Sequence, residues 1–415
     1  MMQPRVLATQ VLYQVVYKQQ HLKLALQSCC PTDYPPQDKA WVQHVCYQSL
    51  RHHQNLNARW QKFITKPLKD HLVGCLLTIS LAQKFHLDTP DHAVVNEAVK
   101  AARKLKKNWA TGLINKVLKL ATADADFVAQ NESEQYNHPQ WWIDLLKKDW
   151  PDHWQQILSA NNQMPPLWVR SPKPMNPEQG TQYQPLPSAW MLHDKQASTS
   201  DAMLAGAYSV QDAAAQYAAW LLAPQPGELI LDACAAPGGK SGHLLEMCND
   251  IKLHVLEKDP ARLQLVSQNL KRLNLHAERL VAGDASQPKA WFQGTKYDKI
   301  LLDVPCSAAG VVRRNPDIKV LRQAEHLKPL TQLQQQILSA IAPLLKVGGT
   351  LLYATCSVFR SENERQIKKF LKTHSNYERQ TINIKAAENC LYGQQIITGT
   401  DQMDGFYYCQ LKRKQ

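Results

Sequence analysis

The sequence predicts an α/β protein: an all-helical domain and a small connecting segment, followed by a doubly wound domain with a largely parallel sheet. Three observations predict this order. Apolar residues recur at helical spacing through the first third of the 415 residues, where glycine is scarce. Trp and Pro become frequent around residues 131–200. From about residue 205, apolar runs that end in turn residues alternate with amphipathic segments. We therefore expect domains at 1–130, 131–204 and 205–415.

The first third carries most of the charge. Residues 1–130 contain 17 Lys plus Arg against 8 Asp plus Glu, a net of +9 out of the formal +13 of the chain. A helix expected from residue 93 onward ends in a basic stretch that suits the helix dipole, formed by Lys100, Arg103, Lys104, Lys106 and Lys107. Such an excess favours a polyanionic partner, nucleic acid before anionic lipid. For this helix alone, a solvated face is an equally good interpretation.

Several classes of protein are disfavoured by composition. No apolar run approaches the ~18 residues of a membrane span. The N-terminus also lacks the layout of a secretory signal. The ten cysteines form no CxxC pair and no Cys/His cluster with zinc-finger spacing. We expect a cytoplasmic protein without membrane association, without a metal site and without dependence on disulfides. Most of its cysteines are interpreted as small buried apolar residues.

The connecting segment and the last domain are predicted element by element. A helix over 139–160 precedes a Pro-Pro break and a short strand at 167–170, followed by loops over 172–200. In the last domain we expect strands at 229–233, 253–257, 279–282, 299–303, 350–355 and 406–411, and helices that include 260–272 and 330–345. Ligands of doubly wound sheets bind at the carboxyl ends of the strands, so the chemistry is sought there.

The first of these strands ends in a glycine-containing loop, which consists of Cys234, Ala235, Ala236, Pro237, Gly238, Gly239 and Lys240. Small residues let a ligand approach the backbone, and the helix that follows supplies free N–H groups. The phosphate-binding P-loop is excluded because position 234 is Cys rather than Gly, and GxGxxG is absent. A tight strand-to-helix turn alone would explain the glycines.

The other strand ends carry carboxylates and thiols. Glu257 is placed to accept the hydroxyls of a ribose, and Asp284 to meet an adenine amino group. Asp303 and Cys306 follow the fourth strand, and Cys356 follows the fifth. No set of phosphate-binding Lys and Arg accompanies them, which favours a nucleoside cofactor without phosphates. Two thiols at adjacent strand ends favour catalysis; a redox pair is the alternative, although redox motifs normally use CxxC.

These motifs resemble those of the RNA 5-methylcytosine methyltransferases of the RsmB/Nop2/Sun family. The resemblance rests on DACAAPGGK, VLEKDPARL, AGDAS, LLDVPCSAAGVVRRNPDIK and LLYATCSVFRSENE, and it covers about 205–415. The first third resembles a NusB-like RNA-binding domain through VVNEAVKAARK and GLINKVLKL, and NNQMPPLWVR resembles the connector of bacterial members. Glu257 stands where the family usually has Asp, Ala233 where it has a bulkier apolar residue, and Asn315 where His is often seen.

The resemblance implies a class I (Rossmann-like) methyltransferase that binds S-adenosylmethionine through the 234–240 loop, Glu257, Asp284 and Asp303. Cys356 is then the nucleophile that attacks cytosine C6, and Cys306 assists proton removal and release. DNA cytosine methyltransferases use a Pro-Cys thiol instead, so Cys306 as nucleophile is the rival assignment. Asp303 would touch the cytosine or the methionine part of the cofactor, and Lys240 would hold the carboxylates of the pocket.

The resemblance of the whole architecture to bacterial small-subunit members implies 16S rRNA as the substrate, before subunit assembly, rather than DNA. Arg313 and Arg314 are candidates for holding the RNA backbone, with a solvated loop as the alternative. Two other functions remain open: the same reaction on tRNA, and a non-catalytic RNA-binding or antitermination protein. We expect a monomer, because no exposed apolar stripe calls for a partner.

Overall fold

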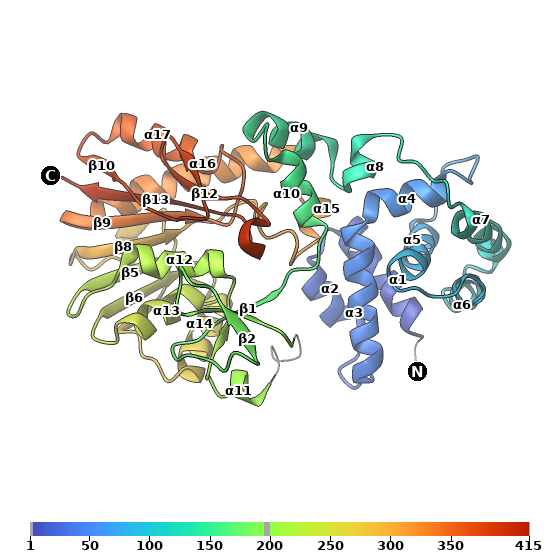
Figure 1. The fold of residues 1–415 in the computed structure, drawn as a ribbon, viewed down its shortest axis with the longest axis horizontal. Helices are drawn as coiled ribbons and strands as arrows, with labels where there is room; N and C mark the ends of the chain where they lie inside the picture. The colour runs from blue at the N-terminus through green and yellow to red at the C-terminus, as the bar shows by residue number, and fades with distance from the viewer. Residues whose placement is uncertain (1–2, 195–199, 415) are drawn as a thin grey trace. The chain divides into compact units, whose positions relative to one another are not determined.

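The computed structural model describes residues 3–194 and 200–414, which form two compact units (Figure 1). The first unit comprises the chain through Gln163 together with the later segment Val312–Ala324. The second unit comprises Met164–Val311 and Glu325–Gln415. The chain therefore leaves the second unit and re-enters it, and the excursion begins six residues after Cys306.

The first unit is all helical, as the apolar periodicity predicts. Its helices are α1 Pro4–Lys18, α2 Leu22–Cys29, α3 Pro36–Arg51, α4 His53–Gln61, α5 His71–His86, α6 Asp91–Lys104, α7 Thr111–Ala123, α8 Glu132–Tyr136, α9 Gln140–Asp149, α10 Trp154–Asn161 and α15 Ile318–Leu321. A short 3-10 turn, Asn108–Ala110, precedes α7. Helix α5 is buried without a break from Val73 to Gln83 and packs against α1, α3, α4, α6 and α7, so it is the centre of this unit.

The helix expected over 139–160 is two helices rather than one. Helix α9 ends at Asp149 and α10 begins at Trp154. Pro151 lies in the turn between them. Proline has no N–H group to continue the helical hydrogen bonds, so the helix ends before it. The residues of this turn are Trp150, Pro151, Asp152 and His153.

The second unit begins with a small antiparallel sheet whose strand order is β2-β3-β1-β4. Its strands are β1 Leu167–Arg170, β2 Gly180–Gln182, β3 Ala189–Leu192 and β4 Ser209–Val210, and the short helix α11 Asp201–Leu204 precedes β4. The predicted strand at 167–170 is confirmed as β1, the strand that pairs with both β3 and β4.

The large sheet has nine strands in the order β11-β12-β13-β9-β8-β5-β6-β7, with β10 paired to β13. Strands β7, β6, β5, β8 and β9 are parallel to one another, and β13 joins β9 in antiparallel fashion. The strands are β5 Leu229–Ala233, β6 Lys252–Glu257, β7 Arg279–Ala282, β8 Tyr297–Asp303, β9 Leu345–Thr355, β10 Tyr377–Gln380, β11 Glu388–Cys390, β12 Gly393–Ile396 and β13 Phe406–Arg413.

Helices cover both faces of this sheet (Figure 1). Neighbouring residues of strand β5 pack into two different apolar cores, one on each face of the sheet. Ile230 belongs to the core that also contains residues of helices α12 Ala213–Leu222, α13 Gly239–Met247 and α14 Pro260–Arg272. Leu231 packs with the cluster that includes α16 Leu327–Ile341 and α17 Glu364–Thr373. This alternation confirms the predicted doubly wound α/β domain.

Strand β9 is longer than predicted. It begins at Leu345 rather than at 350, and it pairs with β8 across a register shift between Tyr297 and Lys299. Gly348 and Gly349 lie at this irregularity. In the structure a Cβ atom at Gly349 would lie only 2.7 Å from the carbonyl oxygen of Asp298, so glycine lets the strand continue through the irregularity. The helix expected over 330–345 ends at Ile341 and is followed by a 3-10 turn.

Candidate active site

A cavity of about 520 Å³ lies at the carboxyl ends of the parallel strands of the second unit. The residues after β5, β6, β7, β8 and β9 contribute to its wall. Seven of the predicted site residues line it: Cys234, Ala236, Glu257, Asp284, Asp303, Cys306 and Cys356. Apolar side chains complete the wall, among them Leu256, Ala285, Val304, Leu333 and Ile337. Ala235, Pro237, Gly238, Gly239 and Lys240 belong to the same loop as Cys234 but are not part of the lining.

The loop between β5 and α13 turns sharply at Gly238, which has a φ of +91°. A Cβ atom at this position would lie 2.9 Å from a methyl carbon of Val266 and 3.1 Å from its Cα. Both the left-handed backbone and the close packing on α14 require glycine. The chain therefore depends on glycine at the point where the loop joins α13.

The two carboxylates after β6 and β7 are held by hydrogen bonds. Glu257 is almost fully buried and accepts from the backbone N–H groups of Ala236 at 3.2 Å and Asp259 at 3.2 Å. Asp284 accepts from the backbone N–H and hydroxyl of Ser286 and pairs with Lys258 at 2.8 Å. The hydrogen bond from Lys258, followed by those from Ser286, lowers the pKa of Asp284 to about 2. Both groups therefore present fixed acceptors at one wall of the cavity.

Lys240 and Asp303 form an ion pair at the edge of the cavity, with Nζ 2.6 Å from Oδ2. Burial by itself lowers the pKa of Lys240, but the charge of Asp303, its hydrogen bond and the nearby Cys356 outweigh burial and raise it. Lys240 therefore stays protonated and places a positive charge near the thiols. The ammonium also lies 5.1 Å from the ring centre of Phe406.

The two cysteines meet in the cavity. The sulfur of Cys306 lies 3.4 Å from the sulfur of Cys356, within hydrogen-bond distance. The hydrogen bond with Cys356 and, next, burial raise the pKa of Cys306 well above its usual range. Cys306 therefore keeps its proton at neutral pH. All ten cysteines are free thiols.

Glu362 is a buried carboxylate that joins the two cysteine loops, and the sequence reasoning missed it. It accepts from the N–H of Ser307 at 2.7 Å and from the hydroxyls of Ser307 at 2.5 Å and Ser357 at 2.6 Å. These serines directly follow the two cysteines. The side-chain amide of Gln334 donates to the same carboxylate at 3.0 Å. The only signal in the sequence was the acidic residue in the segment after Cys356, six positions downstream.

Asp232, the penultimate residue of β5, is a second buried acid. The hydroxyl of Ser241 donates to its Oδ2 at 2.5 Å, and its Oδ1 has no hydrogen-bond partner among the described residues. Burial raises the pKa of Asp232 to about 7, although the Ser241 hydrogen bond and Lys240 oppose this, and the charges of Asp303 and Glu257 add to it. This carboxyl therefore titrates near neutral pH just beneath the glycine loop.

The expectation that Arg313 holds an RNA backbone is wrong for its side chain. Arg313 is fully buried in the segment that belongs to the first unit, and its carbonyl accepts from Arg51 at 2.9 Å. In the same segment the ammonium of Lys319 donates to the carbonyl of Arg51 at 2.6 Å and to the side chain of Asn162 at 2.7 Å. Burial, followed by the charge of Arg51, lowers the pKa of Lys319 well below its usual value. Arg314 is only partly buried.

The arrangement supports nucleoside binding and thiol chemistry in one cavity. Glu257 and Asp284 lie at the ends of β6 and β7, on one side of β5 in the sheet, and Asp303 and the two thiols lie at the ends of β8 and β9, on its other side. Among the described residues, no group of His, Cys, Asp and Glu is arranged to hold a metal ion. No helix in the described part of the chain is long and apolar enough to cross a membrane.

Models of three protein families match the chain. Residues 219–412 match the family described as 16S rRNA methyltransferase RsmB/F, and residues 2–122 match the NusB family. Residues 138–173 match the ferredoxin-like domain described as Methyltr_RsmF/B-like.

Named relatives cover the whole chain. Ribosomal RNA small subunit methyltransferase B of Vibrio cholerae is 39% identical over 100% of this chain and 98% of its own length. The protein of the same name from Shewanella oneidensis is 40% identical over 98% of both chains.

Solved structures share the fold. The structure of PH0851 covers 100% of this chain and 99% of its own, with a TM-score of 0.82 at 21% identity. The structure of NSun6 from Pyrococcus horikoshii with SFG covers 67% of this chain and 98% of its own, with a TM-score of 0.59 at 18% identity.

Proposed function

Because this chain belongs to the RsmB/F family of 16S rRNA methyltransferases, we propose that it methylates C5 of a cytosine in small-subunit rRNA, with S-adenosylmethionine as methyl donor and a covalent cysteine–cytosine intermediate. One observation carries the proposal. Two thiols 3.4 Å apart share a cavity with the carboxylates and the glycine loop that suit a nucleoside cofactor. A non-catalytic RNA-binding protein has no use for this arrangement.

The residues present fit the cofactor. The cavity of about 520 Å³ offers carboxylate acceptors and apolar walls, and the two cations in its lining, Lys258 and Arg262, are paired with Asp284 and Glu257. Glu257 would hold the ribose hydroxyls, and Asp284 the adenine amino group. The loop from Cys234 to Lys240 and Asp303 would hold the methionine part. When bound, the cofactor supplies a methyl group on a sulfonium centre.

We assign the nucleophile to Cys356 and the assisting thiol to Cys306. Addition of the Cys356 thiolate to C6 forms a sulfur–carbon bond and makes C5 nucleophilic enough to accept the methyl group. The C5 proton then leaves to a base, and the sulfur–carbon bond breaks by elimination. Cys306 has a raised pKa and lies beside Cys356, so it is placed to assist the proton transfer and the release of the product.

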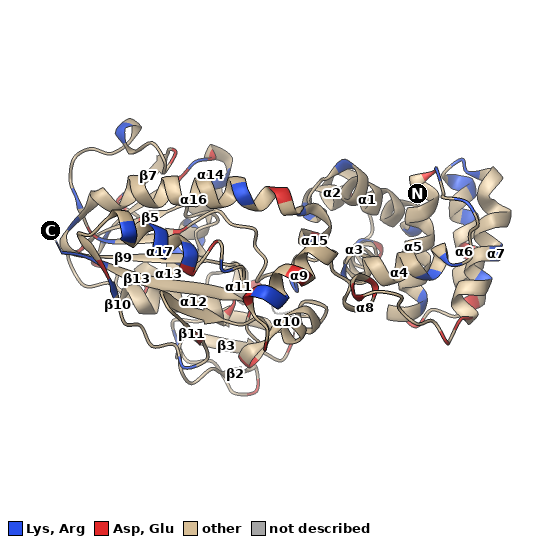
Figure 2. Cartoon of the chain, turned by 90° about the horizontal axis from the view of Figure 1, so that it is seen from above, with Lys and Arg blue, Asp and Glu red and all other residues tan. Residues whose placement is uncertain are grey.

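We assign RNA binding to the helical residues 1–130 and catalysis to residues 205–415. Residues 131–204 connect these two parts. The match to the NusB family and the net charge of +9 support the first assignment. Figure 2 shows Lys and Arg on and around helix α6, where the basic stretch was expected. The target base must leave its stack to reach the cavity, which favours unpaired rRNA before assembly. The proposed substrate places the enzyme in the cytoplasm, and we propose that it acts as a monomer.

The proposal is tested with the full-length protein and methyl-labelled S-adenosylmethionine. Naked small-subunit rRNA, assembled small subunits and tRNA are offered in parallel, and bisulfite sequencing locates the product. We expect one modified cytosine in naked small-subunit rRNA. Modification confined to tRNA would mean that the substrate is tRNA rather than rRNA. Absence of cofactor binding in calorimetry would support the non-catalytic alternative.

A further inference from the structure

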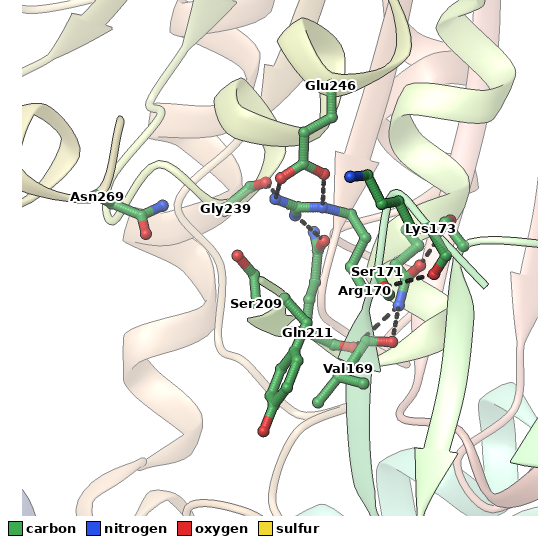
Figure 3. A network of polar contacts seen from close by, with 12 residues as sticks. Val169, Arg170, Ser171, Lys173, Ser209, Gln211, Gly239, Glu246 and Asn269 are labelled. Atoms are coloured by element: carbon green, nitrogen blue, oxygen red, sulfur yellow. Dashed lines mark hydrogen bonds and ion pairs between the residues drawn. The ribbon is translucent and has the colours of Figure 1, made fainter. Parts of the chain in front are cut away.

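Arg170, the last residue of β1, lies fully buried against helix α13 (Figure 3). Its Nε and Nη2 donate to the two carboxylate oxygens of Glu246, at 2.5 and 3.0 Å. Its Nη1 donates to the carbonyl oxygen of Gly239 at 2.7 Å and to the side-chain oxygen of Gln211. A single guanidinium therefore joins the small sheet to the helix that follows the glycine loop.

The two anchors on α13 lie near opposite ends of that helix. Gly239 is its first residue, and Glu246 is the last but one of its nine. Between them, Gly242 leaves space for the guanidinium, because a Cβ atom there would lie 3.3 Å from Nη2 of Arg170. The guanidinium thus lies along the helix and holds it as a unit rather than at one point.

The contact with Gly239 reaches the glycine loop directly. In a planar trans peptide the C=O of one residue and the N–H of the next point in opposite directions. Holding the carbonyl of Gly239 therefore fixes the direction of the N–H of Lys240, whose side chain is paired with Asp303. The amide of Asn269 donates to the neighbouring carbonyl of Gly238 at 3.3 Å and fixes the peptide before it.

We propose that Arg170 is a positioning residue for the cofactor: it sets the glycine loop and the first turn of α13 in the geometry that binds S-adenosylmethionine. This inference rests on the proposed function. The first N–H groups of a helix have no partner within the helix, so their direction matters to an anionic ligand group such as the methionine carboxylate. Arg170 fixes that direction from outside the cavity, since it is not among the lining residues.

The test compares cofactor affinity with fold stability in the full-length protein. Arg170→Lys keeps a positive charge beside Glu246. The lysine ammonium lacks the planar guanidinium group, so it cannot donate both to the carboxylate of Glu246 and to the carbonyl of Gly239. The double variant Arg170→Met with Glu246→Gln removes both buried charges and so avoids leaving one unpaired. Arg413→Met is the matched control, because Arg413 also donates to two backbone carbonyls, those of Pro343 and Leu345, at the opposite end of the sheet.

Calorimetric titration with S-adenosylmethionine is run where circular dichroism shows each variant folded. We expect both Arg170 variants to bind about tenfold or more weakly, which corresponds to about 1.4 kcal/mol. The KM for the cofactor should rise, while the KM for RNA and the kcat at saturating cofactor change little, and Arg413→Met should bind as the wild type does.

A purely structural role makes a different prediction. Variants that melt earlier but bind the cofactor as tightly as the wild type would overturn the inference. If the wild type itself binds no S-adenosylmethionine, the proposed function fails instead, so the two failures are distinguishable.

Discussion

The sulfur of Cys306 lies 3.4 Å from that of Cys356, although the two residues are 50 positions apart in the chain. They follow the adjacent parallel strands β8 and β9, whose carboxyl ends meet at one edge of the sheet. The hydrogen bond with Cys356 and burial raise the pKa of Cys306 well above its usual range, so Cys306 keeps its proton at neutral pH.

The first prediction separates the roles of the two thiols. Cys356→Ala should abolish methylation and give no covalent complex, because no sulfur is left to add to C6. Cys306→Ala should accumulate a protein–RNA adduct, because the adduct forms but is released slowly. Denaturing gels with labelled RNA and cofactor show the adduct directly. An adduct with Cys356→Ala and none with Cys306→Ala would exchange the two assignments.

The second prediction concerns the carboxylate between the cysteine loops. Glu362→Gln should lower the free energy of unfolding by about 3 kcal/mol, because the variant leaves buried donors of Ser307 and Ser357 poorly paired. Methylation should fall as well, since both loops lose their common anchor. Urea unfolding and initial rates measure the two effects. Glu364→Gln is the control, because it breaks a partly exposed ion pair with Arg360. This variant should lower the free energy of unfolding by less than about 1 kcal/mol.

The third prediction is a pH dependence that arises from Asp232. Its pKa in the folded protein is about 7, above the ordinary value of 3.8, so between these values the folded state keeps a proton that the unfolded state releases. Stability should therefore fall as pH rises through this window and level off above it, by about 1.4 kcal/mol per pH unit at most. Asp232→Asn removes this contribution.

The measurement for Asp232 is the difference in free energy of unfolding between the wild type and Asp232→Asn, followed from pH 4 to pH 8, a range that covers the window about the folded pKa of about 7. A difference that stays flat would mean that the carboxyl is not protonated in the folded protein. The exposed Asp250→Asn serves as the control for the loss of one charge.

The fourth prediction tests whether helix α6 contacts RNA. The variant replaces by Gln the exposed Arg103 and Lys104 of α6 and the exposed Lys106 just beyond it. It should bind rRNA more weakly and with a flatter salt dependence, because each lost phosphate contact on a single strand removes about 0.7 from the slope. The matched control replaces Lys368, Lys369 and Lys372 of helix α17, which are also exposed. Equal slopes for both triple variants would assign no special role to α6.

Much of the large sheet could be predicted because its strands are short apolar runs with clear ends. The strands predicted at 229–233 and 279–282 match β5 and β7 residue for residue. The strand ends in turn pointed to Glu257, Asp284, Asp303 and the cysteines, since parallel strands bring their carboxyl ends together. This is why seven predicted residues line one cavity.

The residues whose roles could not be predicted from the sequence act through contacts between distant segments of the chain. Glu362 lies in a loop with no periodicity, and its importance comes from serines 55 and 5 positions away. In the sequence, Arg170 looks like an ordinary strand residue. Only the fold places it beside Glu246, which is 76 positions further along the chain. Arg313 follows the motif that contains Cys306, yet its segment packs with the helices of the first unit. Pattern and composition carry no signal for such pairings.

The excursion of Val312–Ala324 into the first unit has a consequence for synthesis on the ribosome. The helices up to Gln163 emerge first, but the carbonyl of Arg51 and the side chain of Asn162 receive their Lys319 partner only about 150 residues later. At about 5–20 residues per second, that delay is on the order of ten to thirty seconds. The nascent helical unit therefore lacks both contacts of Lys319 until the segment that follows the Cys306 loop has been synthesised.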